Sequence, residues 1–351
     1  MTQQLSQEVA TAAALDMAGE HQAAVAALVQ GVNKDDITAT LQLAKRYLFG
    51  DRAPCNPSDA FNLLERATTL GSANAPALMS NLFAIGYQCQ QSWQGALETQ
   101  ALAALRGNIL SQDQLLLLTA NRKLAAHPSA SADYWREVTR SVNVQDWLTP
   151  PTLHNDLSPD PLIRVFPGFL NKEVCLWLIK RATPKLERAK VYDAVHQQIT
   201  TNRTRNNSSA SFDLVDTDLV NILMQYRMAN CLGVPLKNFD AGTVLHYAPG
   251  EEITEHFDFI DPNVPDYAAQ NERNGQRIVT FMVYLNDNYQ SGNTEFPRLN
   301  LSYKANRGDG LFFVNVLPDA SPNLATLHAG RPPIGGEKWI VSQFIRNAAV
   351  F

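Results

Sequence analysis

Two residues of metal-binding types, His256 and Asp258, stand two positions apart in the stretch Leu245-His-Tyr-Ala-Pro-Gly-Glu-Glu-Ile-Thr-Glu-His-Phe-Asp258. If this stretch is a β-strand, both side chains point to the same face. One more histidine would complete two imidazoles and one carboxylate, a set that holds iron and leaves positions open for substrates. His328 is the candidate. By itself, the His-x-Asp pair is better explained by an exposed, ion-paired histidine.

Further motifs surround this pair in a definite order. They are Tyr247, Pro249-Gly250, Arg277-Ile-Val-Thr280, Tyr284-Leu-Asn-Asp287, Gly292-Asn-Thr-Glu-Phe-Pro297, Arg307-Gly-Asp-Gly-Leu-Phe-Phe313 and, after His328, Lys338-Trp339. The series resembles the catalytic domain of the prolyl 4-hydroxylase type of iron(II)/2-oxoglutarate dioxygenases. The resemblance extends from about Ile163 to Ile345.

The resemblance implies a ligand set and a reaction. It assigns the iron, and with it the catalytic role, to His256, Asp258 and His328. The implied cofactors are Fe(II), 2-oxoglutarate and O2, with ascorbate as a further candidate. The implied reaction converts 2-oxoglutarate and O2 to succinate and carbon dioxide while a C–H bond is hydroxylated. The protein then has to orient that bond and exclude water.

The same resemblance implies a binding site for 2-oxoglutarate. Lys338 stands ten residues after His328, where the family places the lysine that binds the distal carboxylate. A lysine offers a point charge with three donors. Tyr247 matches a tyrosine that donates a hydrogen bond to the cosubstrate, and Thr280 is expected to line the same pocket. The alternative for Lys338 is a surface lysine at the start of a strand.

The chain departs from the family at two places. Ser291-Gly-Asn-Thr294 stands where Gly-Gly-Glu-Thr is frequent, and Arg331 stands where cysteine is frequent. By the resemblance, neither of these positions binds the metal or the cosubstrate. Both could alter the substrate channel, and Arg331 is a candidate for contact with an acidic group of the substrate.

Short strands must position these residues. Alternation and aromatic content predict strands over 243–247, 278–285, 310–313 and 339–345. They fit a sheet closed into a double-stranded β-helix, or jelly roll. Supporting helices are predicted over 171–179 and 216–232. The connection 261–276 is expected to be either a mobile lid or a passive surface insertion.

The first third of the chain has another pattern. Alanine and leucine recur at helical spacing, with a loose repeat of about 36 residues. The pattern resembles Sel1-like repeats, a branch of the tetratricopeptide class; an irregular helical domain is the alternative. Stacked helix pairs form a concave surface of the kind that holds peptides or proteins.

The expected fold class is therefore α+β and multidomain. A passage marked by prolines and serines, from Trp147 to Pro161, reads as a connector. We expect a helical repeat domain over residues 1–150, as a substrate or partner platform, and a dioxygenase domain over 151–351.

The charge and cysteine composition limits which binding partners and which cellular location we expect. The net charge is -5 and charges of both signs are interspersed, which disfavours nucleic-acid and anionic-membrane partners. We expect neither a secretory signal nor a membrane span. The four cysteines lack CxxC spacing and fit reduced thiols of a cytoplasmic protein.

Three functions fit these patterns. The first is hydroxylation of a peptidyl residue, above all proline, with the repeats as a platform. The second is the same chemistry on a small molecule or free amino acid. The third is a catalytically silent repeat scaffold, which the retention of His256, Asp258, His328 and Lys338 disfavours.

Overall fold

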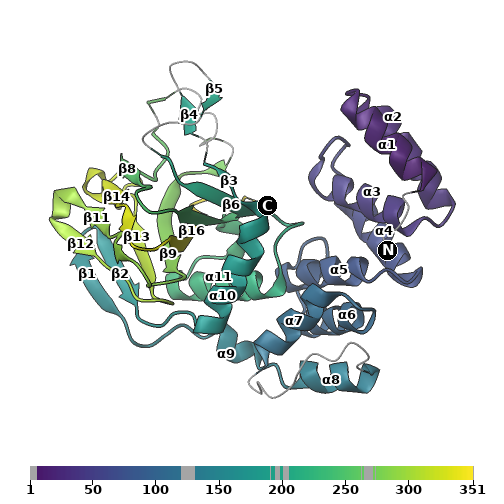
Figure 1. Ribbon diagram of the computed structural model, residues 1–351, viewed down its shortest axis with the longest axis horizontal. Helices are drawn as coiled ribbons and strands as arrows, with labels where there is room; N and C mark the ends of the chain where they lie inside the picture. Colours follow the sequence, from purple (N-terminus) through teal and green to yellow (C-terminus); the bar gives the residue numbers. More distant parts are fainter. Residues whose placement is uncertain are drawn as a thin grey trace. The chain divides into compact units, whose positions relative to one another are not determined.

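The chain forms two compact units (Figure 1). The computed structural model describes residues 6–119, 131–189, 191–193, 198–200, 205–261, 263–264, 272 and 274–350. One unit comprises Met1–Trp147 with Thr217–Leu223, and the other comprises Leu148–Asp216 with Met224–Phe351. The first is helical and the second is built on antiparallel sheets, so the expected α+β two-domain architecture is confirmed.

The helical unit consists of short helices joined by tight turns. In its described part the helices are α1 (Gln7–Met17), α2 (His21–Asn33), α3 (Ile37–Phe49), α4 (Pro57–Thr69), α5 (Asn74–Ile85), α6 (Trp93–Leu105), α7 (Ile109–Leu118) and α8 (Ala132–Arg140), and α9 (Val144–Leu148) follows at its end. Sequential helices pack as pairs, α1 on α2, α3 on α4 and α5 on α6.

The helix ends explain the repeat of about 36 residues. Gly50 and Gly86 end α3 and α5 in the left-handed conformation, with φ of 71° and 76°, which glycine adopts without a Cβ clash. After the loop that follows each glycine, the side-chain oxygens of Asn56 and Ser92 cap the N-termini of α4 and α6. The glycine that ends one helix and the side-chain cap that starts the next recur together along the chain, which confirms the predicted helical repeat.

The second unit contains two main sheets. The large sheet has the order β1-β2-β13-β9-β16-β7-β6-β3, and the small one has the order β12-β11-β14-β8. The large-sheet strands are β1 (Asn155–Pro159), β2 (Leu162–Phe166), β3 (Glu187–Arg188), β6 (Ser208–Phe212), β7 (Gly242–Tyr247), β9 (Arg277–Tyr284), β13 (Gly310–Val314) and β16 (Lys338–Arg346). The small-sheet strands are β8 (Ile253–His256), β11 (Thr294–Phe296), β12 (Leu301–Tyr303) and β14 (His328–Gly330). Two short pairs, β4 (Val191–Asp193) with β5 (Gln198–Thr200) and β10 (Gln290–Ser291) with β15 (Pro333–Ile334), lie outside these sheets.

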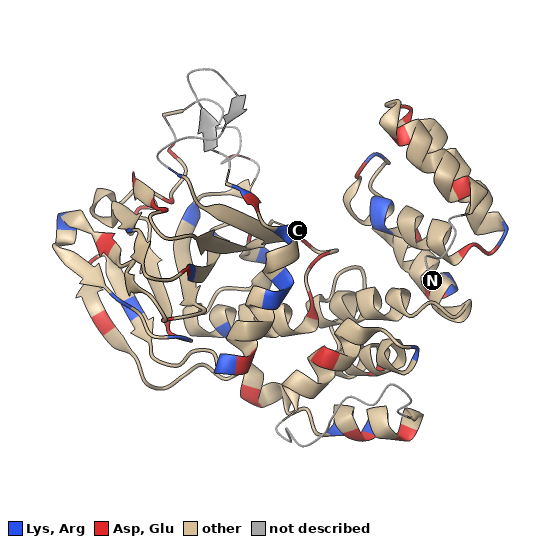
Figure 2. Ribbon diagram, in the orientation of Figure 1, with Lys and Arg blue, Asp and Glu red and all other residues tan. Residues whose placement is uncertain are grey.

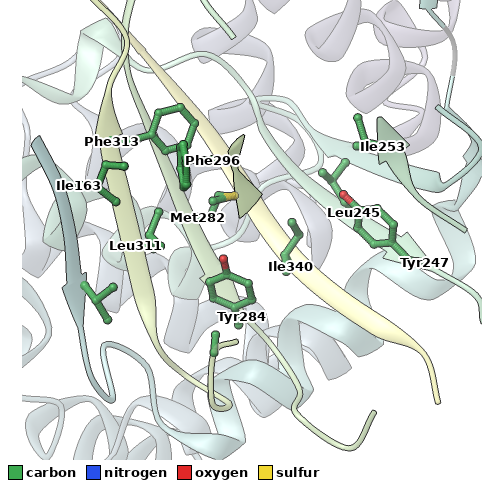
Figure 3. Packing of buried hydrophobic residues seen from close by; sticks show 12 residues of the cluster. Ile163, Leu245, Tyr247, Ile253, Met282, Tyr284, Phe296, Leu311, Phe313 and Ile340 are labelled. Carbon is green, nitrogen blue, oxygen red and sulfur yellow. The ribbon is translucent and has the colours of Figure 1, made fainter. Parts of the chain in front are cut away.

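Apolar side chains of the two sheets meet in one core (Figure 3). Met282 and Phe313 of the large sheet and Phe296 of the small sheet belong to the same buried cluster. The Phe296 and Phe313 rings meet edge to face, with centroids 5.2 Å apart. Because two antiparallel sheets enclose one core, the predicted double-stranded β-helix is confirmed. The four predicted strands correspond to β7, β9, β13 and β16.

Both predicted supporting helices are present. Asn171 caps α10 (Lys172–Ala182) through its side chain, and α10 packs on β6 and β7. The second helix, α11 (Leu219–Leu232), begins later than the predicted Asp216. The reason is the Asp218 carboxylate, which accepts a hydrogen bond from Asn221 N (2.9 Å) at the first turn.

Charged side chains of both signs are interspersed along the ribbon of each unit (Figure 2). No helix in the described ranges is both long and apolar enough to cross a bilayer.

Candidate metal centre and its cavity

The small sheet brings His256, Asp258 and His328 together. His256 ends β8 and pairs across the sheet with His328, which begins β14. Asp258 lies just past the end of β8, and its two carboxylate oxygens lie 3.6 Å from His256 Nε2 and 3.4 Å from His328 Nε2. One donor atom from each residue lies within 4.8 Å of the others. This donor set fits a single divalent metal ion.

Backbone carbonyls orient both imidazoles. The Nδ1 atoms of His256 and His328 lie 2.8 Å and 3.0 Å from the carbonyl oxygens of Thr254 and Thr326, each two residues earlier in the chain. A carbonyl oxygen only accepts, so each Nδ1 carries the proton and donates it. The lone pair of each Nε2 is then free and faces Asp258, as a metal ligand requires.

The local electrostatics keep these groups ready to bind a cation. Burial and, secondarily, the charge of His328 lower the pKa of His256 to about 4. Burial raises the pKa of Asp258, but His328, His256 and the Thr280 hydroxyl outweigh it and hold that pKa below its usual range. At neutral pH His256 is therefore neutral and Asp258 ionised, which are the protonation states that bind a metal.

A cavity of about 650 Å³ extends from this cluster into the core. Lys338 lines it from β16 and is completely buried. The Lys338 ammonium donates to Gly292 O (2.7 Å) and lies 5.1 Å from the Tyr247 ring centroid. Burial and the nearby Lys304 lower the pKa of Lys338 to about 7. Within the described ranges no carboxylate is paired with this ammonium, so it fits an incoming carboxylate.

Tyr247 occupies the space between the lysine and the small sheet. It pairs with Lys338 in the register of β7 and β16. Its hydroxyl lies against Gly330, two residues beyond His328, where an added Cβ would come within 3.3 Å of Tyr247 Oη. Burial raises the pKa of Tyr247, so its hydroxyl stays protonated and can donate a hydrogen bond into the cavity.

Comparisons with known proteins match this part of the chain. The sequence profile of the 2OG-Fe(II) oxygenase superfamily matches residues 242–346. The chain is 30% identical to probable prolyl 4-hydroxylase 10 of Arabidopsis thaliana over 209 residues, which cover 54% of this chain and 70% of that protein. The chain belongs to the prolyl 4-hydroxylase family of 2OG-Fe(II) oxygenases. It is therefore a 2-oxoglutarate-dependent dioxygenase, and the family implies Fe(II), 2-oxoglutarate and O2.

Two solved structures are also similar to parts of this chain. The viral collagen prolyl hydroxylase of Paramecium bursaria chlorella virus-1, in its 2OG complex, is 28% identical with a TM-score of 0.41 and covers 52% of this chain and 95% of its own. A Sel1 repeat protein from Oxalobacter formigenes is 23% identical with a TM-score of 0.26 and covers 32% of this chain and 85% of its own.

Two side chains of this prolyl 4-hydroxylase-family site were not singled out from the sequence. The Tyr284 hydroxyl and Thr294 Oγ1 lie 2.8 Å apart, and the ring centroid of Tyr284 lies 5.9 Å from Lys338 Nζ. Thr294 lines the cavity. Both residues stand in the motifs Tyr-Leu-Asn-Asp and Gly-Asn-Thr, so the signal was present. Their common position beside Lys338 depends on the packing of β9, β11 and β16.

Thr280, expected in the cosubstrate pocket, lies behind the metal cluster. It is buried and does not belong to the cavity lining. Its hydroxyl donates to Asp258 Oδ2 (2.8 Å) and accepts from Asn315 Nδ2 (3.0 Å). Thr280 shares a face of β9 with the cavity-lining Met282, but its hydroxyl is engaged by the Asp258 carboxylate, which itself lines the cavity. Thr280 thus contacts the carboxylate directly.

Arg331, a candidate for substrate contact, is engaged elsewhere. Its guanidinium donates to Glu295 (2.6 Å) and lies 3.5 Å from Glu255, and the residue does not line the cavity. Two other arginines do: Arg205 and Arg277 both line the cavity, and the Arg277 guanidinium lies 3.9 Å from the ring centroid of Phe344. The expectation for Arg331 is therefore not supported by its contacts.

The segment 261–276 lies largely outside the described residues, so its expected role as a lid or an insertion stays open. At its described ends, Gln276 donates to and accepts from the backbone of Ile260 (2.8 Å and 2.7 Å). These bonds join the two ends of the connection.

Proposed function

We propose that the sheet-built unit hydroxylates a peptidyl residue, above all proline, using Fe(II), 2-oxoglutarate and O2. The observation that supports this proposal is that one cavity has His256, Asp258 and His328 in its lining together with the buried ammonium of Lys338, which pairs with no carboxylate among the described residues. Such a cavity suits a cosubstrate that reaches from a metal to a buried cation.

His256, Asp258 and His328 are the proposed metal ligands. When bound there, iron would activate O2, so that one oxygen atom is used in the oxidative decarboxylation of 2-oxoglutarate and the other enters the C–H bond. Thr280 and the carbonyls of Thr254 and Thr326 hold the three ligand side chains in place. These hydrogen bonds favour deprotonated ligand atoms that need little rearrangement to bind.

Lys338 and Tyr247 are the proposed cosubstrate-binding residues. The ammonium of Lys338 would pair with the distal carboxylate, and the hydroxyl of Tyr247 would donate to the cosubstrate. The pair formed by Tyr284 and Thr294 adds hydroxyls beside the same lysine. We assign Thr280 to the support of Asp258 instead of to cosubstrate binding.

A peptide is the proposed substrate because polar side chains continue from this cavity into a second one. Arg205, Ser209 and Ser211 line the first cavity, and Ser209 and Ser211 also line an adjoining cavity of about 550 Å³. An extended substrate could continue from one cavity into the other. Prolyl 4-hydroxylases are the relatives that the chain matches, which favours proline as the residue that is modified.

We further propose that residues 1–150 are a platform for the substrate or a partner protein, and that residues 151–351 carry the reaction. Helix pairs with a period of about 36 residues fit such a surface. Ascorbate as a reductant and a cytoplasmic location belong to the same proposal, as does the absence of nucleic-acid and membrane partners.

The test is turnover by the full chain loaded anaerobically with Fe(II) and then exposed to O2. We expect succinate formation that a pool of proline-rich peptides stimulates, with a mass increase of one oxygen atom on proline. Asp258→Ala is the matched inactive control. Succinate that free amino acids or small molecules stimulate, with unmodified peptides, would favour the small-molecule alternative; no succinate from the metal-loaded chain would favour the scaffold.

A further inference from the structure

A third cavity lies beside the metal centre. It has a volume of about 440 Å³ and is lined by Phe257, Phe259, Asp261, Asn263, Pro322 and Leu324. We refer to these six residues as the aromatic pocket. Four of them are apolar, and Leu324 is 55% exposed although it is a large hydrophobic residue. The two polar members place a carboxylate and an amide among these apolar walls.

The first wall of the aromatic pocket is held in place by several contacts. The rings of Phe257 and Phe259 stack with centroids 4.7 Å apart and an interplanar angle of 29°. The guanidinium of Arg298 lies 5.5 Å from the Phe257 centroid. The backbone of Ile260, next to Phe259, is bonded on both sides by the buried Gln276 side chain.

The second wall is equally ordered. Arg298, in η3 (Pro297–Leu299), donates to Leu324 O (2.8 Å), so one side chain connects both walls. Asn323 accepts from Ala325 N (3.0 Å) and caps η4 (Leu324–Thr326). Pro322 forms a β-bridge with Val316. A pocket with walls that are already fixed loses little entropy when a ligand enters it.

Phe257 connects this pocket with the catalytic cavity. It stands between the proposed ligands His256 and Asp258 and lines both cavities. A chain whose target residue lies at the metal centre therefore has the aromatic pocket as a neighbouring place for an adjacent residue.

We propose that the aromatic pocket is a specificity subsite for an apolar side chain that flanks the hydroxylated residue of the peptide substrate. This inference rests on the proposed peptide hydroxylation. Stacked phenyl rings, a proline and a leucine offer apolar surface to a ring or a branched aliphatic side chain. The oxygens of Asp261 and Asn263 are acceptors for a backbone N–H of the same peptide.

The test uses peptides with a single proline in which one position at a time, on either side, carries phenylalanine, leucine or serine. We measure hydroxylation by mass and derive KM and kcat for the full chain loaded with Fe(II). At one flanking position, phenylalanine or leucine is expected to lower KM about tenfold or more relative to serine. Leu324→Ser and Phe259→Ala should reduce that preference.

Ile334→Ser is the matched control, because Ile334 is 60% exposed and lies outside both cavities. We expect Leu324→Ser to raise KM for the apolar peptide and leave KM for the serine peptide unchanged, and Ile334→Ser to change neither. An equal effect on both peptides, or no preference in the unaltered chain, would overturn the subsite. If no peptide is hydroxylated at all, the proposed function fails and the subsite with it.

Discussion

His256 and His328 face each other across β8 and β14, with ring centroids 4.2 Å apart. Each ring donates from Nδ1 to the carbonyl two residues before it, so the two strands present their Nε2 atoms to Asp258 in the same way. The register shifts between His328 and Gly330. Such irregularities re-aim side chains next to active sites, and here the shift immediately follows a proposed ligand.

Asp258→Ala should remove metal binding and turnover together. The carboxylate is the only anionic member of the proposed ligand set, and both Nε2 atoms lie next to its oxygens. We expect a loss of Fe(II) or Co(II) affinity larger than the ~10- to 100-fold that removal of a ligand's hydrogen-bond partner costs. Anaerobic titration calorimetry measures it. Asp156→Asn, a half-exposed surface position, is the control, and unchanged affinity in Asp258→Ala would refute the ligand assignment.

Thr280→Val tests whether the hydroxyl orients Asp258. The substitution keeps the shape of the side chain but removes the 2.8 Å hydrogen bond to Oδ2. We expect metal affinity to fall about 10- to 100-fold, with the KM for 2-oxoglutarate unchanged at saturating metal. A raised KM with normal metal affinity would instead return Thr280 to the cosubstrate pocket. Thr183→Val, which removes an exposed helix hydroxyl, is the matched control.

The affinity for 2-oxoglutarate should fall as the pH rises above about 7. Burial lowers the pKa of Lys338 to about 7 in the ligand-free cavity, so above that pH the amine is mostly neutral and must take up a proton to pair with a carboxylate. Lys338→Met should raise the KM roughly 10- to 100-fold, as expected for one charged contact, and should abolish this pH dependence. A pH profile that is identical in both proteins would contradict the assignment.

Lys338 should also affect the pH dependence of folding. The folded pKa is lower than that of an unfolded lysine, so between these values the unfolded chain binds more protons and stability rises with pH. Lys338→Met should therefore stabilise the ligand-free protein most below pH 7 and progressively less as the pH increases. Denaturant unfolding at several pH values measures the difference, and an effect that grows with pH would have the wrong sign.

Gly292→Ala should weaken both stability and cosubstrate binding. Gly292 has a φ of +68°, and an added Cβ would lie 2.7 Å from the Tyr289 ring. Any shift also moves the carbonyl that accepts from Lys338. Gly335→Ala is the matched control, because it has a φ of +70° and open space around it. In both variants the free energy of unfolding should fall by about 1 kcal/mol because of backbone strain. Only Gly292→Ala should lose further folding stability and raise the KM for 2-oxoglutarate.

Local sequence patterns are sufficient to predict the main helices and strands. Asn171 and Gly50 mark the start and end of helices through a side-chain oxygen and a positive φ, both of which are local properties. The β-branched and aromatic residues of 278–285 mark β9 for the same reason. The first turn of α11 was placed too early, since the capping Asp218 competes with the equally plausible Asp216.

The proximity of His256 and Asp258 could be predicted from the sequence alone, because residues two positions apart stay close even in an extended chain. The sequence also determined the order of motifs that marks the family. The pairing of His328 with His256 and the hydrogen bond from Thr280 to Asp258 became visible only in the folded chain. The same is true of the cavity lining, which includes Arg277 and not Arg331. Those relationships depend on which strands pair and on which face each residue lies, and both are set by the packing of the two sheets around one core.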